Sequence, residues 1–163
     1  MQITIRPYLV TDEQACLQLF ESNCPLYFDA SELALFANWL KHQGTGAAYQ
    51  SPTYSDAMHD AFYVITAPQL GIVACGGFYI VKNLTEARMA WGMVAASLHK
   101  KGYGKALYTF RKFEIEQKWP QYQITLGTSQ HTYQFYKKMG LKVQQIIPQG
   151  YGPLLDRIDM VAL

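Results

Sequence analysis

The strongest constraint on the fold is a junction in the second half of the chain, where a strand pattern runs through a basic turn into an amphipathic helix. The strand pattern covers residues 87–94, and the helix pattern covers residues 103–118, with Leu107 and Phe110 on its apolar face. A strand followed directly by a helix that packs back on it is typical of an α/β arrangement. The junction therefore predicts a sheet covered by helices.

The rest of the chain supplies further strands and helices on both sides of this junction. Strand patterns are expected at residues 3–8, 61–67, 71–81, 123–128, 141–147 and 157–161. Helix patterns are expected at residues 12–24, 29–43 and 132–139, with a polar loop at 44–60. With 163 residues, of which 50% are hydrophobic, the chain is expected to form one domain, 1–163. The expected class is α/β (α+β), a mixed sheet of about seven strands flanked by about four helices.

The turn itself predicts an anion-binding site. Gly102 and Gly104 let the backbone bend closely around a ligand, and the helix that follows begins with free N–H groups. Positive charge is added by three lysines of the turn, Lys100, Lys101 and Lys105.

Two better-known phosphate loops do not fit this turn. A Walker loop would need glycine at His99 and Ser or Thr at Ala106. The dinucleotide fingerprint would need a third glycine at Leu107. Neither ATP or GTP nor NAD is therefore expected by these routes.

The turn resembles the coenzyme A pyrophosphate loop of the GNAT superfamily of N-acetyltransferases. Val94 falls at the family's strand valine, and Gly102 and Gly104 fall at its two glycines. His99 stands where the family has Arg or Gln, and Ala96 stands where it often has Pro. A histidine can still donate an N–H to a phosphate.

A second family signature is similar to residues 135–141, in which Tyr136 matches a tyrosine that lies near the coenzyme sulfur. The order of strands and helices also follows the GNAT order over essentially the whole chain. The start, Ile5-Arg6-Pro7 followed by Asp12, resembles the family's first strand and helix. The resemblance therefore implies a GNAT fold, an acetyltransferase activity and acetyl-CoA as cosubstrate.

The resemblance also implies a set of coenzyme-binding residues. Ser129 stands where the family has an asparagine that contacts the pantetheine arm. Gly92 predicts a β-bulge that separates two strands, so that backbone N–H groups near Met93 and Val94 bind the acetyl carbonyl. The full set is Met93, Val94, His99, Lys100, Lys101, Gly102, Tyr103, Gly104, Lys105 and Ser129.

Two catalytic residues follow from the same resemblance. Tyr136 is expected to share a proton with the departing thiolate. The acceptor amine must lose a proton before attack, because a lysine-like amine is neutral in only about one molecule in several thousand at pH 7. Glu86, near the start of the strand before the turn, is the candidate general base, with His99 and His131 as alternatives.

Aromatic residues outside the coenzyme loop are candidates for the acceptor pocket. Tyr27, Phe28 and Tyr151 are the main substrate-binding candidates, and Trp39, Tyr49 and Tyr54 are further ones. Four carboxylates are also candidates to attract a cationic amine: Asp29, Glu32, Asp56 and Asp60.

Composition excludes several other classes. A net charge of +2 does not favour generic nucleic-acid binding, and 3 cysteines without a Cys-x-x-Cys pair indicate neither a disulfide framework nor a metal site. Residues 71–81 form the longest apolar run and are too few to cross a membrane, so a cytoplasmic protein without membrane contact is expected. The sequence leaves a homodimer open.

Two alternatives to an enzyme remain from the sequence. The departures at His99, Ala96 and Ser129 leave open a non-catalytic acyl-CoA-binding or sensing domain of the same fold. A basic module that binds nucleic acid or acidic protein is the other alternative, and it would show salt-sensitive binding without affinity for coenzyme A.

Overall fold

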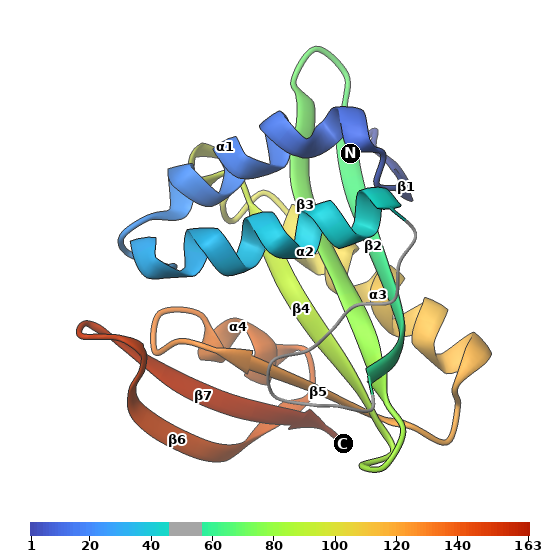
Figure 1. The fold of residues 1–163 in the computed structure, drawn as a ribbon, viewed down its shortest axis with the longest axis vertical. Helices are drawn as coiled ribbons and strands as arrows, with labels where there is room; N and C mark the ends of the chain where they lie inside the picture. The colour runs from blue at the N-terminus through green and yellow to red at the C-terminus, as the bar shows by residue number, and fades with distance from the viewer. Residues whose placement is uncertain (46–56) are drawn as a thin grey trace.

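A computed structural model describes residues 1–45 and 57–163 as a twisted sheet of seven strands in the order β1-β2-β3-β4-β5-β7-β6 (Figure 1). Only β4 and β5 run parallel, and the other neighbouring pairs are antiparallel. The strands are β1 (Thr4–Pro7), β2 (Ala57–Ala67), β3 (Gly71–Val81), β4 (Glu86–Val94), β5 (Gln123–Thr128), β6 (Leu141–Gly152) and β7 (Leu155–Ala162).

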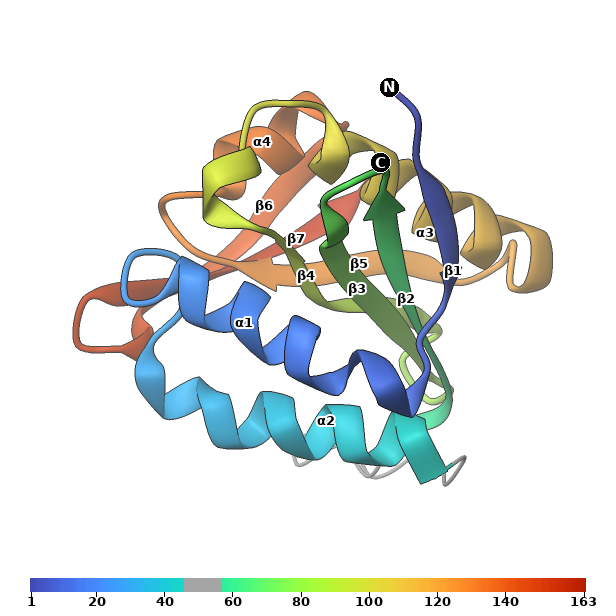
Figure 2. The same ribbon diagram turned by 90° about the horizontal axis from the view of Figure 1, so that it is seen from above.

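The helices cover the two faces of this sheet. They are α1 (Glu13–Asn23), α2 (Leu33–Thr45), α3 (Tyr103–Lys118) and α4 (Tyr133–Lys138). Helices α1 and α2 lie on one face, and α3 and α4 lie on the other (Figure 2). None of the described helices combines the length and apolar character needed to span a membrane. The predicted mixed sheet of seven strands with four helices is confirmed.

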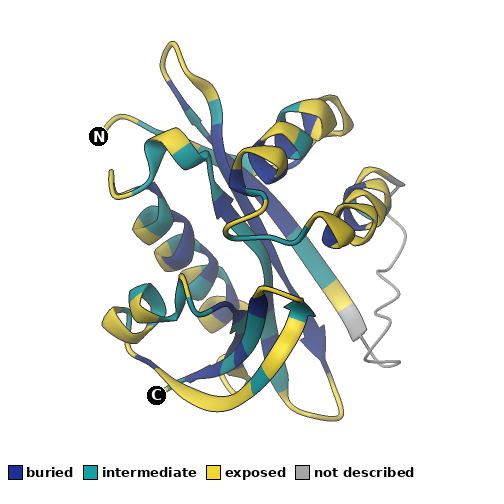
Figure 3. Ribbon diagram, turned by 90° about the vertical axis from the view of Figure 1, so that its left-hand side faces the viewer, coloured by how far each residue is buried: buried dark blue, intermediate teal, exposed yellow. Residues whose placement is uncertain are grey.

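Side chains of the central strands point alternately to the two faces of the sheet and fill the core on both faces. In β2, Phe62 and Val64 pack with the residues under α1 and α2, whereas Tyr63 and Ile65 pack on the side of α3. Buried positions therefore concentrate in the middle of the sheet, and the edge strand β6 is mostly exposed (Figure 3).

Three predicted boundaries were wrong. Strand β2 begins at Ala57, inside the stretch predicted as a loop, because its early residues pair with the end of β3. Strand β6 continues to Gly152 instead of ending near 147, since its pairing with β7 resumes at Leu155 after an irregularity. Gly44 lies within α2 and not beyond its end.

A partly buried ion pair joins the first strand to the start of the first helix. Both terminal nitrogens of Arg6 donate to the Asp12 carboxylate, at 2.7 and 2.9 Å. The same carboxylate accepts the Leu9 N–H at 2.8 Å, and these interactions, led by Arg6, lower the pKa of Asp12. The Arg6 and Asp12 of the opening motif thus fix where the chain enters α1.

Strands β4 and β5 pair only over their first halves. The parallel register runs from Glu86 opposite Gln123 to Met89 opposite Leu126 and then stops. Beyond it, Trp91 and Gly92 together oppose the single residue Gly76 of β3, and Trp91 takes a φ of 53°. The bulge predicted at Gly92 is confirmed, and the two parallel strands separate from this point.

Gly77 of β3 leads to a stability prediction. A Cβ at this position would clash with the Ala61 carbonyl oxygen and lie 2.9 Å from Phe62 Cδ2, so Gly77→Ala should lower the free energy of unfolding by roughly 3 kcal/mol. Denaturant unfolding measures this change. Gly44→Ala is the control, because its Cβ makes ordinary contact with Val10 and should stabilise α2 by at most about 1 kcal/mol. Equal stability of the two variants would contradict this packing.

Candidate active site

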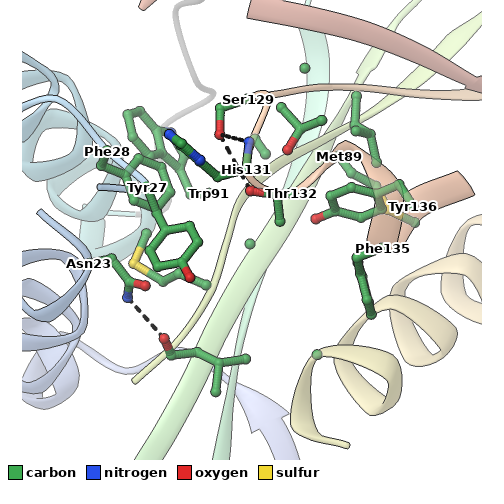
Figure 4. Close-up of a pocket in the computed structure, with 18 of the residues that line it drawn as sticks. Asn23, Tyr27, Phe28, Met89, Trp91, Ser129, His131, Thr132, Phe135 and Tyr136 are labelled. Carbon is green, nitrogen blue, oxygen red and sulfur yellow. Dashed lines mark hydrogen bonds between the residues drawn. The ribbon is translucent and has the colours of Figure 1, made fainter. Parts of the chain in front are cut away.

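A cavity of about 740 Å³ opens where β4 and β5 separate. Its walls come from α1 and the loop before α2, from the bulged half of β4, from the end of β5, from the turn before α3, from α4 and from the end of β6. Figure 4 shows Tyr27, Phe28 and Trp91 on one side of the cavity and Phe135 and Tyr136 on the other. Segments that are far apart in the sequence thus line the same cavity.

The basic turn forms one end of the cavity. Lys100 and Gly102 take positive φ values of 63° and 92°, which swing the chain sharply into α3. No side chain caps this helix, and its first helical bond runs from the Ala106 N–H to the Gly102 carbonyl. Among the described residues, the N–H groups of Tyr103, Gly104 and Lys105 therefore have no backbone acceptor, so they present partial positive charge.

His99 binds the end of β4. Its Nε2 lies 3.0 Å from the Val94 carbonyl oxygen, which also accepts a bond of 2.9 Å from Asn23 Nδ2 of α1. The His99 ring meets Tyr27 edge-on, with 4.9 Å between ring centroids. The imidazole thus connects the turn with β4 and with the segment after α1.

Tyr136 and Ser129 lie on the side of the cavity that carries α4. The Tyr136 ring packs edge-on against Tyr108 of α3 and against Phe135, at centroid distances of 6.1 and 4.9 Å. The Ser129 side chain is buried, and its hydroxyl lies 3.4 Å from Thr132 Oγ1 and accepts the His131 N–H at 3.4 Å (Figure 4). These contacts hold the residues that follow β5 at the start of α4.

The opposite end of the cavity is aromatic and acidic. Phe28 stacks on Trp91 of the bulge, with 6.2 Å between ring centroids. Tyr151, from the end of β6, and Glu32 also line this end. Burial raises the pKa of Tyr151 well above its usual range, and the Glu32 carboxylate adds a smaller effect in the same direction.

Glu32 is the one buried carboxylate among the described residues of the cavity wall. It accepts the Asp29 N–H at 2.9 Å and is only 9% exposed. Burial raises the pKa of Glu32 to about 7, against the opposing effect of the Asp29 hydrogen bond. Its carboxylate therefore changes protonation near neutral pH, as a general base must.

Most of the residues predicted from the sequence meet at this cavity. The wall includes Tyr27, Phe28, Met93, Val94, His99, Lys100, Gly102, Gly104, Lys105, Ser129, His131, Tyr136 and Tyr151.

Other predicted residues lie elsewhere. The Tyr103 side chain is buried in the core under α3, and Lys101 is exposed beside the cavity wall. Trp39 is fully buried in the core under α2. The loop candidates Tyr49, Tyr54 and Asp56 lie outside the described residues.

Glu86 does not line the cavity. Its carboxylate accepts a bond of 3.2 Å from Thr125 Oγ1 and lies 3.5 Å from Arg88 Nη1, in the paired half of β4 and β5. The sequence places it eight residues before Val94, and in an extended strand this spacing puts it at the far end.

Several wall residues were not identified from the sequence as site residues, among them Asn23, Trp91 and Arg111. Trp91 precedes the glycine that marks the bulge, so that glycine was an available signal. Arg111 lies between Phe110 and Ile115 on the buried side of α3. Arginine is rarely buried, so its place on this apolar side could have indicated a functional residue. Asn23 offered no signal beyond its place at the end of α1.

No group of potential metal ligands occurs in the described parts of the chain.

Solved structures similar to this one are acetyltransferases. A GNAT-family acetyltransferase structure from Desulfovibrio desulfuricans aligns with a TM-score of 0.76 and 16% identity over 98% of both chains. The ribosomal-protein-S18-alanine N-acetyltransferase of Escherichia coli aligns with a TM-score of 0.71 and 18% identity over 99% of this chain and 93% of that one.

A third structure, of mutant forms of the spermidine/spermine N-acetyltransferase of Vibrio cholerae, has a TM-score of 0.68 and 15% identity over 99% of this chain and 95% of that one. The sequence matches no protein-family model and no curated protein. The likeness is one of three-dimensional structure over nearly the full length of each chain, and the chain has the fold of the GNAT N-acetyltransferases.

Proposed function

We propose that this protein is an acetyl-CoA-dependent N-acetyltransferase that transfers the acetyl group to a primary amine by direct attack within a ternary complex. The observation that carries the proposal is one cavity with two chemically different ends. An uncapped, lysine-flanked helix N-terminus lies at one end, and a buried carboxylate with aromatic rings lies at the other. The structural neighbours named above acetylate a ribosomal-protein alanine and spermidine or spermine, both of which are amines.

The coenzyme end fits a pyrophosphate. Free N–H groups at the start of α3, the open backbone at Gly102 and Gly104, and the ammonium groups of Lys100 and Lys105 all favour a doubly charged anion. Acetyl-CoA supplies the reactive thioester when bound. Ser129 and the half of β4 that does not pair with β5, at Met93 and Val94, would hold its pantetheine arm and acetyl carbonyl.

Tyr136 and Glu32 would divide the proton transfers between them. Tyr136, on α4, would donate its phenolic proton to the departing sulfur. Glu32, at the aromatic end, would accept the proton of the amine, directly or through water. We assign the base to Glu32 instead of Glu86 because Glu86 is bound to Thr125 and Arg88 outside the cavity.

The coenzyme end is tested by a charge placed at the start of α3. Gly104→Glu should keep the fold, because its Cβ has ordinary contacts of 3.6 Å or more and an acidic residue favours a helix N-terminus. It should weaken acetyl-CoA binding at least about tenfold by repelling the pyrophosphate, as measured by calorimetry. Gln117→Glu, exposed on the same helix, adds the same charge and should leave the affinity unchanged.

Activity is tested by release of free thiol from acetyl-CoA across a panel of amines, including polyamines and amino-terminal peptides. Acceleration by at least one amine, lost in Gly104→Glu, is expected. Tight coenzyme binding without thiol release from any amine would instead indicate a non-catalytic acyl-CoA sensor. Absence of coenzyme binding would exclude both functions.

Removing the Tyr136 hydroxyl tests the protonation of the sulfur. Tyr136→Phe should lower kcat by about 10²- to 10⁴-fold while coenzyme affinity stays the same, because the proton donor acts only as the thioester breaks. Tyr133→Phe is the control, since Tyr133 lies on the same helix but outside the cavity wall, and its hydroxyl bonds only to Gln134 among the described residues. Equal kcat values for the two variants would remove the role of Tyr136.

The pH dependence of the rate tests Glu32. Because the base must be ionised and burial raises the pKa of Glu32 to about 7, kcat should rise with pH up to about 7 and then level off. Glu32→Gln should lose this rise and lower kcat by about 10²-fold or more, while its amide oxygen still accepts the Asp29 N–H. Glu21→Gln, exposed on α1, should keep the wild-type profile. An unchanged profile in Glu32→Gln would place the base elsewhere.

A further inference from the structure

Arg111 of α3 is a buried cation that has no carboxylate partner in the described parts of the chain. Its side chain is among the most buried of the protein, with 2% of the residue exposed. Its Nη1 donates to the Gly77 carbonyl at 3.1 Å, and its Nε donates to the Leu107 carbonyl at 3.4 Å. Among the described residues, no carboxylate lies within ion-pair distance of it.

Such a charge is costly in a protein core. Removing an ion from water costs several kcal/mol, and neutral carbonyl groups compensate only part of this cost. A guanidinium carries five N–H donors, and two bonds to backbone carbonyls leave donors available on its terminal nitrogens. Burial lowers the pKa of Arg111, but a guanidinium stays protonated in proteins, so the positive charge remains.

The guanidinium lies under the β-bulge that opens the cavity. A Cβ at Gly92 would approach Nη2 to 2.8 Å, and a Cβ at Gly76, opposite the bulge, would approach Nη1 to 3.1 Å. Glycine at both positions thus provides the space that the guanidinium fills. Arg111 is also part of the cavity wall, so its free donors lie at the floor of the proposed active site.

Tyr136 of α4 lies near this charge. Its ring packs edge-on against Tyr108, three residues before Arg111 on α3, and both Tyr136 and Arg111 line the cavity. The charge interaction with the Tyr136 phenol opposes the lowering of the Arg111 pKa by burial. Tyr108 adds a weaker effect of the same direction from within α3. The cation on α3 therefore sits beside the phenol on α4 that faces the cavity.

We propose that Arg111 is a positioning residue that stabilises negative charge on Tyr136 and, through it, on the sulfur during acetyl transfer. This inference rests on the proposed acetyltransferase function. As the amine nitrogen bonds to the acetyl carbon, the carbon–sulfur bond breaks and its electron pair passes to sulfur, which takes the Tyr136 proton. Arg111 then faces a phenolate, and the unpaired cation becomes half of an ion pair. Glu32 takes the proton of the amine, and solvent returns an equivalent proton to Tyr136.

Two substitutions separate this role from a structural one. Arg111→Met keeps a long, flexible side chain without charge, and replacing a buried charge by an apolar group is often neutral or stabilising. We therefore expect unchanged or raised thermal stability, unchanged coenzyme affinity and a kcat about 10- to 100-fold lower. Arg111→Lys keeps the charge and should recover a large part of the lost kcat. A purely structural role predicts instead that kcat follows stability in both variants.

A binding measurement tests the same point without turnover. At pH 9, where part of the free thiol is ionised, the wild type should bind coenzyme A more tightly than desulfo-coenzyme A, which lacks the sulfur. In Arg111→Met this preference should disappear, while the affinity for desulfo-coenzyme A stays the same. A preference that survives in Arg111→Met would overturn the inference.

The outcome also separates this inference from the proposed function. Binding and turnover by the wild type together with normal kcat in Arg111→Met would overturn the role of Arg111 and leave the acetyltransferase intact. Failure of the wild type to bind either coenzyme analogue would overturn both. In a Tyr136→Phe background, Arg111→Met should cost little further kcat, because the two residues act as a unit; two independent, additive losses would contradict this coupling.

Discussion

The separation of β4 from β5 is the constraint on which the site depends. Parallel strands in a sheet normally stay paired to their ends, and here the pairing stops after four residue pairs. A single bulge causes this, because Trp91 and Gly92 occupy the space opposite one residue of β3. The cavity and the edge of β4 that faces it both follow from that local insertion.

The bulge and Arg111 depend on each other. The guanidinium fills the space left by two missing side chains, and the backbone of β3 supplies its acceptor at Gly77. An apolar residue would fill the same space at lower desolvation cost. The proposed interaction with the phenol of Tyr136 gives the charge a role that an apolar residue could not fill.

The sequence predicted the fold well because its strongest signals are local. The helix at Tyr103–Lys118 and the strand at Gln123–Thr128 have the bounds that the patterns indicate, since Gly102, Pro120 and the apolar periodicity mark their limits. The sharp turn into α3 was equally legible, because its glycines and lysines are contiguous in the chain. The end of β6 could not be predicted in this way. Its pairing with β7 resumes only beyond an irregularity that no local sequence pattern indicates.

Residues whose role depends on distant contacts were harder to predict. Glu86 and Glu32 are both glutamates next to regular structure, and only the fold shows that one faces Thr125 and Arg88 and the other faces the cavity. The two carboxylates differ chemically because only one is buried, and burial depends on how the helices pack on the sheet. Arg111 was overlooked for a related reason, because its value depends on glycines from two other strands.

The Val94 carbonyl connects α1 with the basic turn, and this has a consequence for ligand binding. One oxygen accepts bonds from Asn23, at the end of α1, and from His99, in the basic turn. A ligand that draws either side chain away leaves the remaining donor as the sole partner of that oxygen, and so changes the energy of the other end. Thermodynamic linkage makes such an effect mutual: whatever one substrate does to the affinity of the second, the second does to the first. Displacement of either side chain by a ligand would in this way couple binding beside α1 to binding at the basic turn.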